Sequence, residues 1–196
     1  SAARIHALEA ALAERDPADC VACLGLAGAE VADAGAWLPP LLPFARATVV
    51  QDAQTALQGA LGDADGIVAA IGTGSVFMRR LHGQVTVVGG RGAVLGDEAS
   101  GAWLGKRLLA LTLRAADGVE DHSPLTRALL AGMGGVGGII AFARTASGAD
   151  FAARARILAD NPADPAAMAV LDRADRHVAA YVARLQPPGE PLPVTF

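Results

Sequence analysis

The sequence predicts an α/β fold in which mixed sheets are flanked by helices. Three observations predict it. The first third of the chain alternates short apolar runs with helical patterns, as parallel strands joined by helices do. Residues 66–88 then hold apolar runs separated by glycine turns, which is typical of an antiparallel meander. Residues beyond 99 follow a helical period almost to the end.

In the first third, apolar spacing and chain-breaking residues set the expected elements. The run from Cys20 to Gly28 is continuously apolar, which predicts a strand buried on both faces of a parallel sheet. We expect, in order, a helix over residues 2–15, parallel strands near 20–26 and 47–51 with a short helix between them that breaks before Pro39, and a helix that ends near Gly62.

The sequence pattern changes near residues 62–66, from alternating strands and helices to apolar runs separated by glycine turns. We therefore place a boundary there between a first lobe, 1–63, and a second, 64–196. Glycines and His82 mark the turns of a three-strand meander near 66–88. After it we expect a polar loop over 89–98, a helix over 99–116, helices with glycine-rich interruptions between 121 and 161, an amphipathic helix over 166–185 whose stripe begins at Met168, and the start of a strand at 192–196.

Composition excludes several classes of protein. Sixteen Lys and Arg stand against twenty Asp and Glu, with a net charge of -4 and no long run of one sign, so we expect no nucleic-acid partner. No uncharged apolar stretch reaches the length of a membrane span, so we expect no membrane association. The only cysteines, Cys20 and Cys23, offer no disulfide framework, and a reducing cytoplasm fits best.

The segment Gly72–Ser75 is the first candidate site. Two glycines around a hydroxyl residue, after a buried strand, let a tight turn aim backbone N–H groups and the hydroxyls of Thr73 and Ser75 at a phosphate. Turns of this kind are also common in hairpins, so for Gly72 and Gly74 taken alone an ordinary hairpin turn is the favoured alternative. The pattern also lacks the lysine of a Walker loop.

Asp52 is the second candidate, because it directly follows a predicted parallel strand. Ligands bind at the carboxyl ends of such strands, and a carboxylate there can accept a hydroxyl proton. Asp is also a favoured N-cap residue, so helix capping is the alternative.

The third candidate is the glycine-rich stretch 89–98, which ends in Asp97 and Glu98 before a predicted helix. Such carboxylates can bind sugar hydroxyls or a metal's water shell. The alternative is a surface loop whose acids favour the positive end of the helix dipole.

Cysteine and histidine offer no further site. Strand alternation would turn Cys20 and Cys23 to opposite faces, which favours core packing over a redox or metal site. The histidines are far apart in sequence and are predicted to be solvated rather than part of a catalytic triad: His6, His82, His122 and His177.

Together, the segments 51–56, 71–75 and 89–100, with the sequences QDAQTA, IGTGS and GGRGAVLGDEAS, resemble the BadF/BadG/BcrA/BcrD ATPase family, and especially its N-acetylglucosamine and glucosamine kinases. The resemblance implies a two-lobed, ribonuclease-H-like (actin-like ATPase) fold. It also implies ATP and Mg²⁺ between the lobes, and phosphoryl transfer to an amino-sugar hydroxyl. Related kinases are often dimers, so a homodimer is a further expectation.

Site roles follow from the resemblance position by position. Asp52 matches the catalytic acid of the family, which serves as general base. Gly72, Thr73, Gly74 and Ser75 match its second phosphate loop. Gly90 and Asp97 match sugar-contacting positions with Glu98 beside them, and no residue of this segment is expected to ligate a metal directly.

Two family motifs, a first phosphate loop and a Gly-Gly adenosine motif, are not found in this sequence. We therefore expect the fold to be incomplete at both ends, with the chain a fragment that is inactive as a kinase by itself. Val76 stands where animal members of the family carry Asn.

Two other functions remain open. One is the related ATPase that activates acyl-CoA dehydratases or reductases through a shared iron–sulfur cluster, although this chain has Ser75 rather than Cys in the phosphate loop. The other is a non-catalytic, sugar-sensing regulator with actin-like lobes, against which the presence of Asp52 argues.

Overall fold

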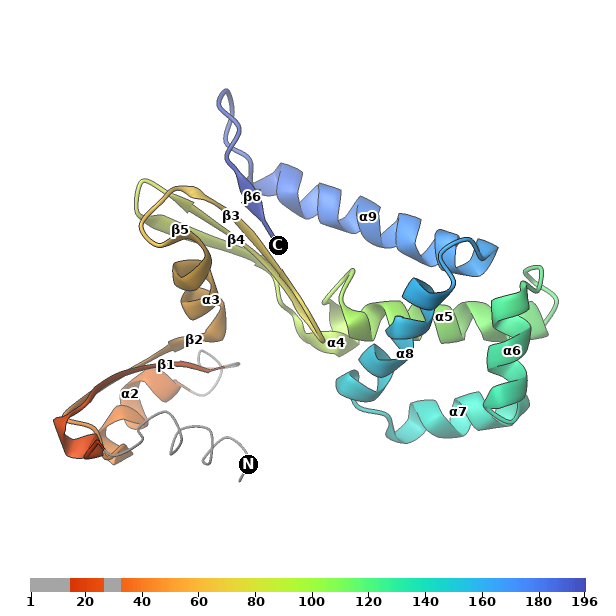
Figure 1. Cartoon of the computed structure of the whole chain (residues 1–196), viewed down its shortest axis with the longest axis horizontal. Helices are drawn as coiled ribbons and strands as arrows, with labels where there is room; N and C mark the ends of the chain where they lie inside the picture. The colour runs from red at the N-terminus through yellow and green to blue at the C-terminus, as the bar shows by residue number, and fades with distance from the viewer. Residues whose placement is uncertain (1–14, 27–32) are drawn as a thin grey trace. The chain divides into compact units, whose positions relative to one another are not determined.

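The computed structural model describes residues 15–26 and 33–196, so the helix predicted over residues 2–15 lies outside the described residues. The chain divides into two compact units, Ser1–Gly62 and Asp63–Phe196, which we describe one at a time (Figure 1).

The first unit is built around two parallel strands. Its described elements are a 3₁₀ turn η1 (Pro17–Asp19), β1 (Val21–Leu26), α2 (Ala34–Trp37), a second 3₁₀ turn η2 (Pro39–Leu41), β2 (Arg46–Gln51) and α3 (Asp52–Leu61). Strands β1 and β2 pair in parallel from Val21↔Arg46 to Leu26↔Gln51. Ala34 and Val49 form a small core, against which Leu24 and Leu38 pack.

Strand β1 is more exposed than its apolar sequence predicts. Val21 is 66% exposed, and the Cys23 side chain is exposed as well. The described part of this sheet has two strands, so β1 has a neighbour on one side only. The expectation that both faces of this strand are buried, with its cysteines in the core, is therefore wrong for Cys23.

A glycine in β1 allows α3 to approach the strand closely. A Cβ on Gly25 would lie 2.3 Å from Thr55 Oγ1 and 3.1 Å from the Asp52 Cα. Thr55 in turn donates its hydroxyl to the Asp52 carbonyl over 2.7 Å. The absence of a side chain at Gly25 therefore sets the position of the first turn of α3.

The second unit contains a mixed sheet. The strands β3 (Gly66–Ile71), β4 (Ser75–Leu81), β5 (Gln84–Gly89) and β6 (Val194–Thr195) lie in the order β5-β4-β3-β6. The first three pair antiparallel, and β6 joins β3 in parallel. The turn between β4 and β5 consists of His82 and Gly83, both with positive φ, as a tight hairpin requires. The predicted α/β fold with a mixed sheet is confirmed.

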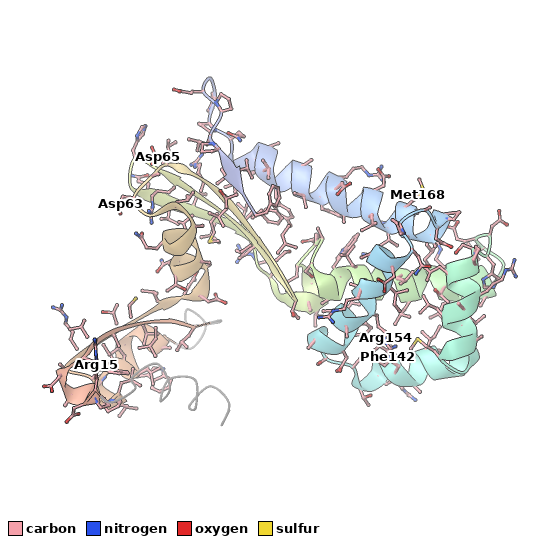
Figure 2. All side chains as sticks on the ribbon, viewed as in Figure 1. Arg15, Asp63, Asp65, Phe142, Arg154 and Met168 are labelled. Atoms are coloured by element: carbon pink, nitrogen blue, oxygen red, sulfur yellow. The ribbon has the colours of Figure 1, made fainter. Side chains whose placement is uncertain are left out.

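Helices make up the rest of this unit: α4 (Gly92–Leu95), α5 (Gly101–Ala116), α6 (Pro124–Gly132), α7 (Gly135–Thr145), α8 (Gly148–Asp160) and α9 (Pro165–Leu185). Helices α5 and α8 approach closely at Gly105, where a Cβ would lie 1.9 Å from the Phe151 carbonyl oxygen. Figure 2 shows Arg154 and Phe142 side by side, with the guanidinium 5.0 Å from the ring centroid.

Helix α9 joins the helical core to the sheet. Val170 and Ala174 belong to the core between the helices, whereas Leu185 packs with Ile67 and Phe77 of the sheet. Met168, predicted to be part of the apolar stripe, is 57% exposed and projects from the helix in Figure 2. Its neighbours Ala166 and Ala167 are buried instead, because small side chains let the helix pack closely.

Within the described residues, no single helix has both the length and the apolar character to cross a membrane. Taken together, α6 and α7 have the length and the apolar composition of a membrane span, but they are bent by 74° relative to each other.

Candidate functional site

The turn predicted to bind phosphate links β3 to β4. Inside it, the Gly72 N–H donates to the Gly74 carbonyl over 2.8 Å. The Gly72 amide is therefore used inside the turn. The amides of Thr73 and Gly74 donate to no described residue. Thr73 is exposed. The turn can therefore offer an anion two backbone donors and the Thr73 hydroxyl.

Ser75 has a different environment from Thr73. It is 4% exposed, and its hydroxyl donates to the Glu98 carbonyl over 2.7 Å. The hydroxyl proton is thus engaged inside the protein. In this structure Ser75 joins the turn to the glycine-rich loop, rather than offering a donor to a phosphate.

The start of α5 fixes the same turn from the other side. The N–H groups of Gly101 and Ala102 donate to the carbonyls of Gly72 and Thr73 over 2.8 and 3.1 Å. Ser100 is the N-cap of α5 and accepts from the Trp103 N–H. Ser100 therefore caps the N-terminus of α5. Asp97 and Glu98, the two carboxylates that the sequence suggested for this end of the helix, do not cap it.

The glycine-rich loop begins with backbone that side chains would not tolerate. Gly89, Gly90 and Gly92 have φ of 75°, 66° and 82°. A Cβ on Gly90 would also lie 3.1 Å from the Val76 Cγ2. The Gly90 N–H donates to the Ser75 carbonyl, which holds the exposed Gly90 beside the turn. The loop then forms the single helical turn α4 where the sequence predicted none.

Asp97 packs against the turn at 72–75, the candidate phosphate loop. Its side chain belongs to a residue that is 8% exposed, and its Oδ1 accepts from the Gly92 N–H over 3.0 Å. A Cβ on Gly74 would lie 2.8 Å from Asp97 Oδ2, so the carboxylate packs directly on the turn. The predicted phosphate and sugar segments are therefore in contact within the second unit.

Glu98 points to helix α9 instead of the α5 terminus. Its Oε2 accepts from the Tyr181 hydroxyl over 2.8 Å. Burial raises the pKa of Tyr181 most, and the hydrogen bond and negative charge of Glu98 raise it further. The tyrosine therefore keeps its proton for this bond throughout the neutral range.

Asp52 belongs to the first unit and is exposed at the start of α3. The N-cap of that helix is Gln51, so Asp52 is its first helical residue and not its cap. Its Oδ1 accepts from the adjacent Ala53 N–H over 2.8 Å. The carboxylate is held locally, and its second oxygen accepts no hydrogen bond from a described residue.

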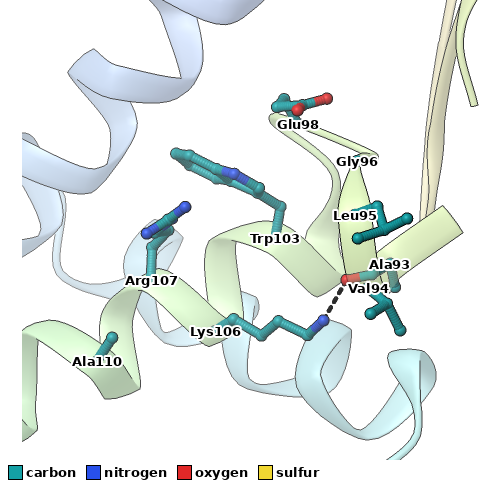
Figure 3. A pocket seen from close by; sticks show the side chains of 9 residues that line it. All are labelled: Ala93, Val94, Leu95, Gly96, Glu98, Trp103, Lys106, Arg107 and Ala110. Carbon is teal, nitrogen blue, oxygen red and sulfur yellow. Dashed lines mark hydrogen bonds between the residues drawn. The ribbon is translucent and has the colours of Figure 1, made fainter. Parts of the chain in front are cut away.

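A pocket of about 280 Å³ lies between α4 and α5 (Figure 3). Lys106 reaches across it to the Ala93 carbonyl, and the Arg107 guanidinium lies 5.3 Å from the Trp103 ring centroid. Glu98 reaches the pocket rim. Lys106 is thus a structural cation that holds α4 on α5.

Sequence reasoning missed Tyr181 and Lys106, and it gave Gly92 no role of its own within the stretch 89–98. Tyr181 follows Val178 by three residues on the inward face of α9, so helical spacing could have placed it near the core. No sequence signal gives its partner. Among the histidines, His82 is exposed as predicted, whereas His177 packs edge-on against Trp103 with ring centroids 5.3 Å apart, and His6 lies outside the described residues. The described part of the chain gathers no three His, Cys, Asp or Glu that could hold a metal.

The sequence profile of the BadF/BadG/BcrA/BcrD ATPase family matches residues 6–189, which is most of the chain. The chain belongs to this family. The three segments that carry the resemblance, 51–56, 71–75 and 89–100, all lie inside the matched range. Family membership therefore rests on most of the chain as well as on its motifs.

Two curated relatives in this family bear the names of sugar kinases. Glucosamine kinase GspK of Vibrio cholerae is 36% identical over 130 residues, which is 65% of this chain and 44% of the relative. The N-acetylmuramic acid/N-acetylglucosamine kinase of Clostridium acetobutylicum is 31% identical over 100 residues, or 48% of this chain and 33% of the relative. The chain thus matches less than half the length of either relative.

Solved structures agree on the fold. A Chromobacterium violaceum protein classed as an N-acetylglucosamine kinase has a TM-score of 0.86 and 38% identity, over 98% of this chain and 70% of that protein. A Porphyromonas gingivalis protein has a TM-score of 0.66 at 22% identity, over 90% and 63%, and supports the fold alone. The predicted actin-like ATPase fold class is confirmed.

Proposed function

We propose that this chain belongs to an ATP-dependent kinase that phosphorylates an amino sugar, either glucosamine or N-acetylglucosamine. One observation supports this most: the predicted phosphate turn and the predicted sugar carboxylate are packed together, with Asp97 Oδ2 against Gly74. A kinase must bring these two ligands within reacting distance. The names of the relatives supply the sugar class.

In this proposal Asp52 is the general base. Its exposed carboxylate accepts the proton of a sugar hydroxyl while the hydroxyl oxygen forms a bond to the γ-phosphorus and the bond to the ADP oxygen breaks. The amides of Thr73 and Gly74 and the Thr73 hydroxyl stabilise negative charge on the phosphoryl oxygens. Gly90, Asp97 and Glu98 hold the sugar. Ser75 contributes by fixing the turn.

ATP fits this assignment, because the turn at 72–75 offers donors and no carboxylate of its own. Mg²⁺ is expected to accompany ATP and would neutralise phosphate charge.

The remaining assignments follow from family membership. We propose that residues 1–63 are the rear of an N-terminal lobe and 64–196 are part of a C-terminal lobe. We further propose a cytoplasmic enzyme, consistent with free thiols at Cys20 and Cys23, that can form a homodimer.

The proposal is tested by ATP turnover in the full-length protein with glucosamine, N-acetylglucosamine or glucose. We expect strong stimulation by one amino sugar and little by glucose. Turnover that no sugar stimulates would refute the proposal and favour the acyl-CoA-linked ATPase.

A further inference from the structure

Tyr181 connects helix α9 to the loop that carries the proposed sugar residues. Its hydroxyl donates to Glu98 Oε2 over 2.8 Å, across 83 residues of sequence. Such a bond contributes more than a neutral one, because the acceptor is charged and the site is partly buried. The bond is also a long-range link, so it constrains where the loop can lie.

The ring of Tyr181 is held in one place by the sheet. It stacks on Phe77 with centroids 4.6 Å apart and an angle of 14° between the planes. Phe77 is fully buried. At the end of β5, a Cβ on Gly89 would lie 3.4 Å from the Phe77 ring and 3.8 Å from the Tyr181 ring. Because the ring is confined by these neighbours, the hydroxyl has little freedom to leave Glu98.

Besides the Asp97 carbonyl, which accepts from the Ser100 N–H, three longer-range contacts hold the Asp97–Glu98 segment. The Glu98 carbonyl accepts from Ser75, Asp97 Oδ1 accepts from the Gly92 N–H, and the Glu98 carboxylate accepts from Tyr181. Asp97 itself has a φ of 56°, in a region that non-glycine residues seldom adopt. Loss of the third contact would leave a partly buried carboxylate without this donor and draw Glu98 toward water.

We infer that Tyr181 is a positioning residue for sugar binding, which acts through Glu98 to hold the Asp97–Glu98 segment on the phosphate turn. This inference rests on the proposed function. Tyr181 makes no proposed contact with the sugar. Its contribution is the geometry of the two carboxylates.

The donor role is compatible with every charged group around the hydroxyl. Burial raises the pKa of Tyr181 most, Glu98 and Asp97 raise it further, Arg91 lowers it, and the net direction is upward. The group therefore stays protonated at neutral pH and can donate to Glu98 whenever the enzyme is active.

The test is Tyr181→Phe in the full-length protein, because this change removes the hydroxyl and keeps the stacked ring. We expect the KM for the amino sugar to rise about 5- to 20-fold, as loss of a charge-assisted hydrogen bond does, with the KM for ATP within about twofold of wild type. Arg176→Ala, on the same helix but in an exposed ion pair with Asp172, is the matched control and should change neither constant.

Calorimetric titration of the amino sugar tests whether the Tyr181 hydroxyl acts through Glu98. In a Glu98→Ala background, Tyr181→Phe should have no further effect on sugar affinity, because the residue acts only through that carboxylate. Hydrogen exchange should show faster exchange of the Gly92 amide in Tyr181→Phe, whose bond to Asp97 depends on the same segment. An equal loss in both backgrounds would mean that the Tyr181 hydroxyl acts independently of Glu98, and would overturn the inference.

The possible outcomes distinguish a failure of the Tyr181 inference from a failure of the proposed function. Wild-type turnover stimulated by an amino sugar, with wild-type sugar KM in Tyr181→Phe, overturns the inference and leaves the proposed function standing. A wild-type protein that neither binds nor turns over any amino sugar overturns both.

Discussion

Asp52 in the first unit and Asp97 in the second are both carboxylates assigned to the reaction, but they are held in opposite ways. Asp52 is exposed and accepts one hydrogen bond from the adjacent amide. Asp97 is 8% exposed, has a positive φ, accepts from Gly92 and packs on Gly74. One side chain is presented to solvent, and the other is built into the fold.

The difference matches the two proposed tasks. A general base must gain and lose a proton in each cycle, so an accessible carboxylate suits it. A residue that orients a substrate works best when the surrounding structure fixes its rotamer. We therefore expect substitution of Asp52 to lower the catalytic rate with little change in stability, and substitution of Asp97 to lower the stability as well.

The largest effect should come from Asp52→Asn. We expect kcat to fall about 10²- to 10⁴-fold, the usual contribution of a general base, with sugar KM and the unfolding midpoint little changed because the side chain is exposed. Steady-state kinetics and thermal unfolding measure both. Gln54→Ala, at another exposed position near the start of α3, is the control. Near wild-type kcat in Asp52→Asn would leave Asp52 with a structural role only.

Asp97→Asn should behave differently, because the side chain is buried. We expect weaker sugar binding together with a loss of about 1–3 kcal/mol in the free energy of unfolding, the cost of disturbing a buried hydrogen-bonded group. Urea denaturation and calorimetric titration are the measurements. A variant with lower affinity but wild-type stability would contradict the contrast between the two carboxylates.

Gly25→Ala tests how the first unit positions Asp52. The new Cβ would collide with the Thr55 side chain and lie 3.1 Å from the Asp52 Cα, so either Thr55 or α3 must shift. We expect a destabilisation of about 1–3 kcal/mol, typical of overpacking, and a lower kcat. Gly59→Ala, where a Cβ meets nothing within 4 Å, should be neutral or stabilising. If Gly25→Ala and Gly59→Ala changed stability and kcat equally, the close approach of α3 to β1 at Gly25 would not be what positions Asp52.

The smallest effects distinguish the two hydroxyls of the phosphate turn. Ser75→Ala should cost about 0.5–1.5 kcal/mol of stability, because it removes a buried hydrogen bond to Glu98. Thr73→Val should leave stability within about 0.5 kcal/mol and raise the KM for ATP, since that hydroxyl is exposed. The reverse pattern would assign phosphate binding to Ser75 instead.

Local chemistry made part of the fold predictable. The turn at His82 and Gly83 follows from residues that tolerate positive φ between two apolar runs, and the structure has a hairpin there. The helical period of residues 166–185 likewise predicts α9. These features depend on neighbours a few positions apart, which a sequence displays directly.

Long-range partners were not predictable in the same way. The bond from Tyr181 to Glu98 spans 83 residues, and the bond from Ser75 to the Glu98 carbonyl spans 23. Neither leaves a periodic signal. The helix dipole argument for Asp97 and Glu98 failed because Ser100 supplies the cap and both carboxylates find other partners. Exposure of Val21 depends on how many strands neighbour β1, which its own sequence does not encode.

The most direct test of the central claim is the identity of the product. The full-length protein is incubated with ATP and glucosamine or N-acetylglucosamine, and sugar phosphate and ADP are quantified by mass spectrometry. We expect sugar phosphate and ADP to form in equal amounts, and Asp52→Asn to form little of either. ADP released without any sugar phosphate would contradict it.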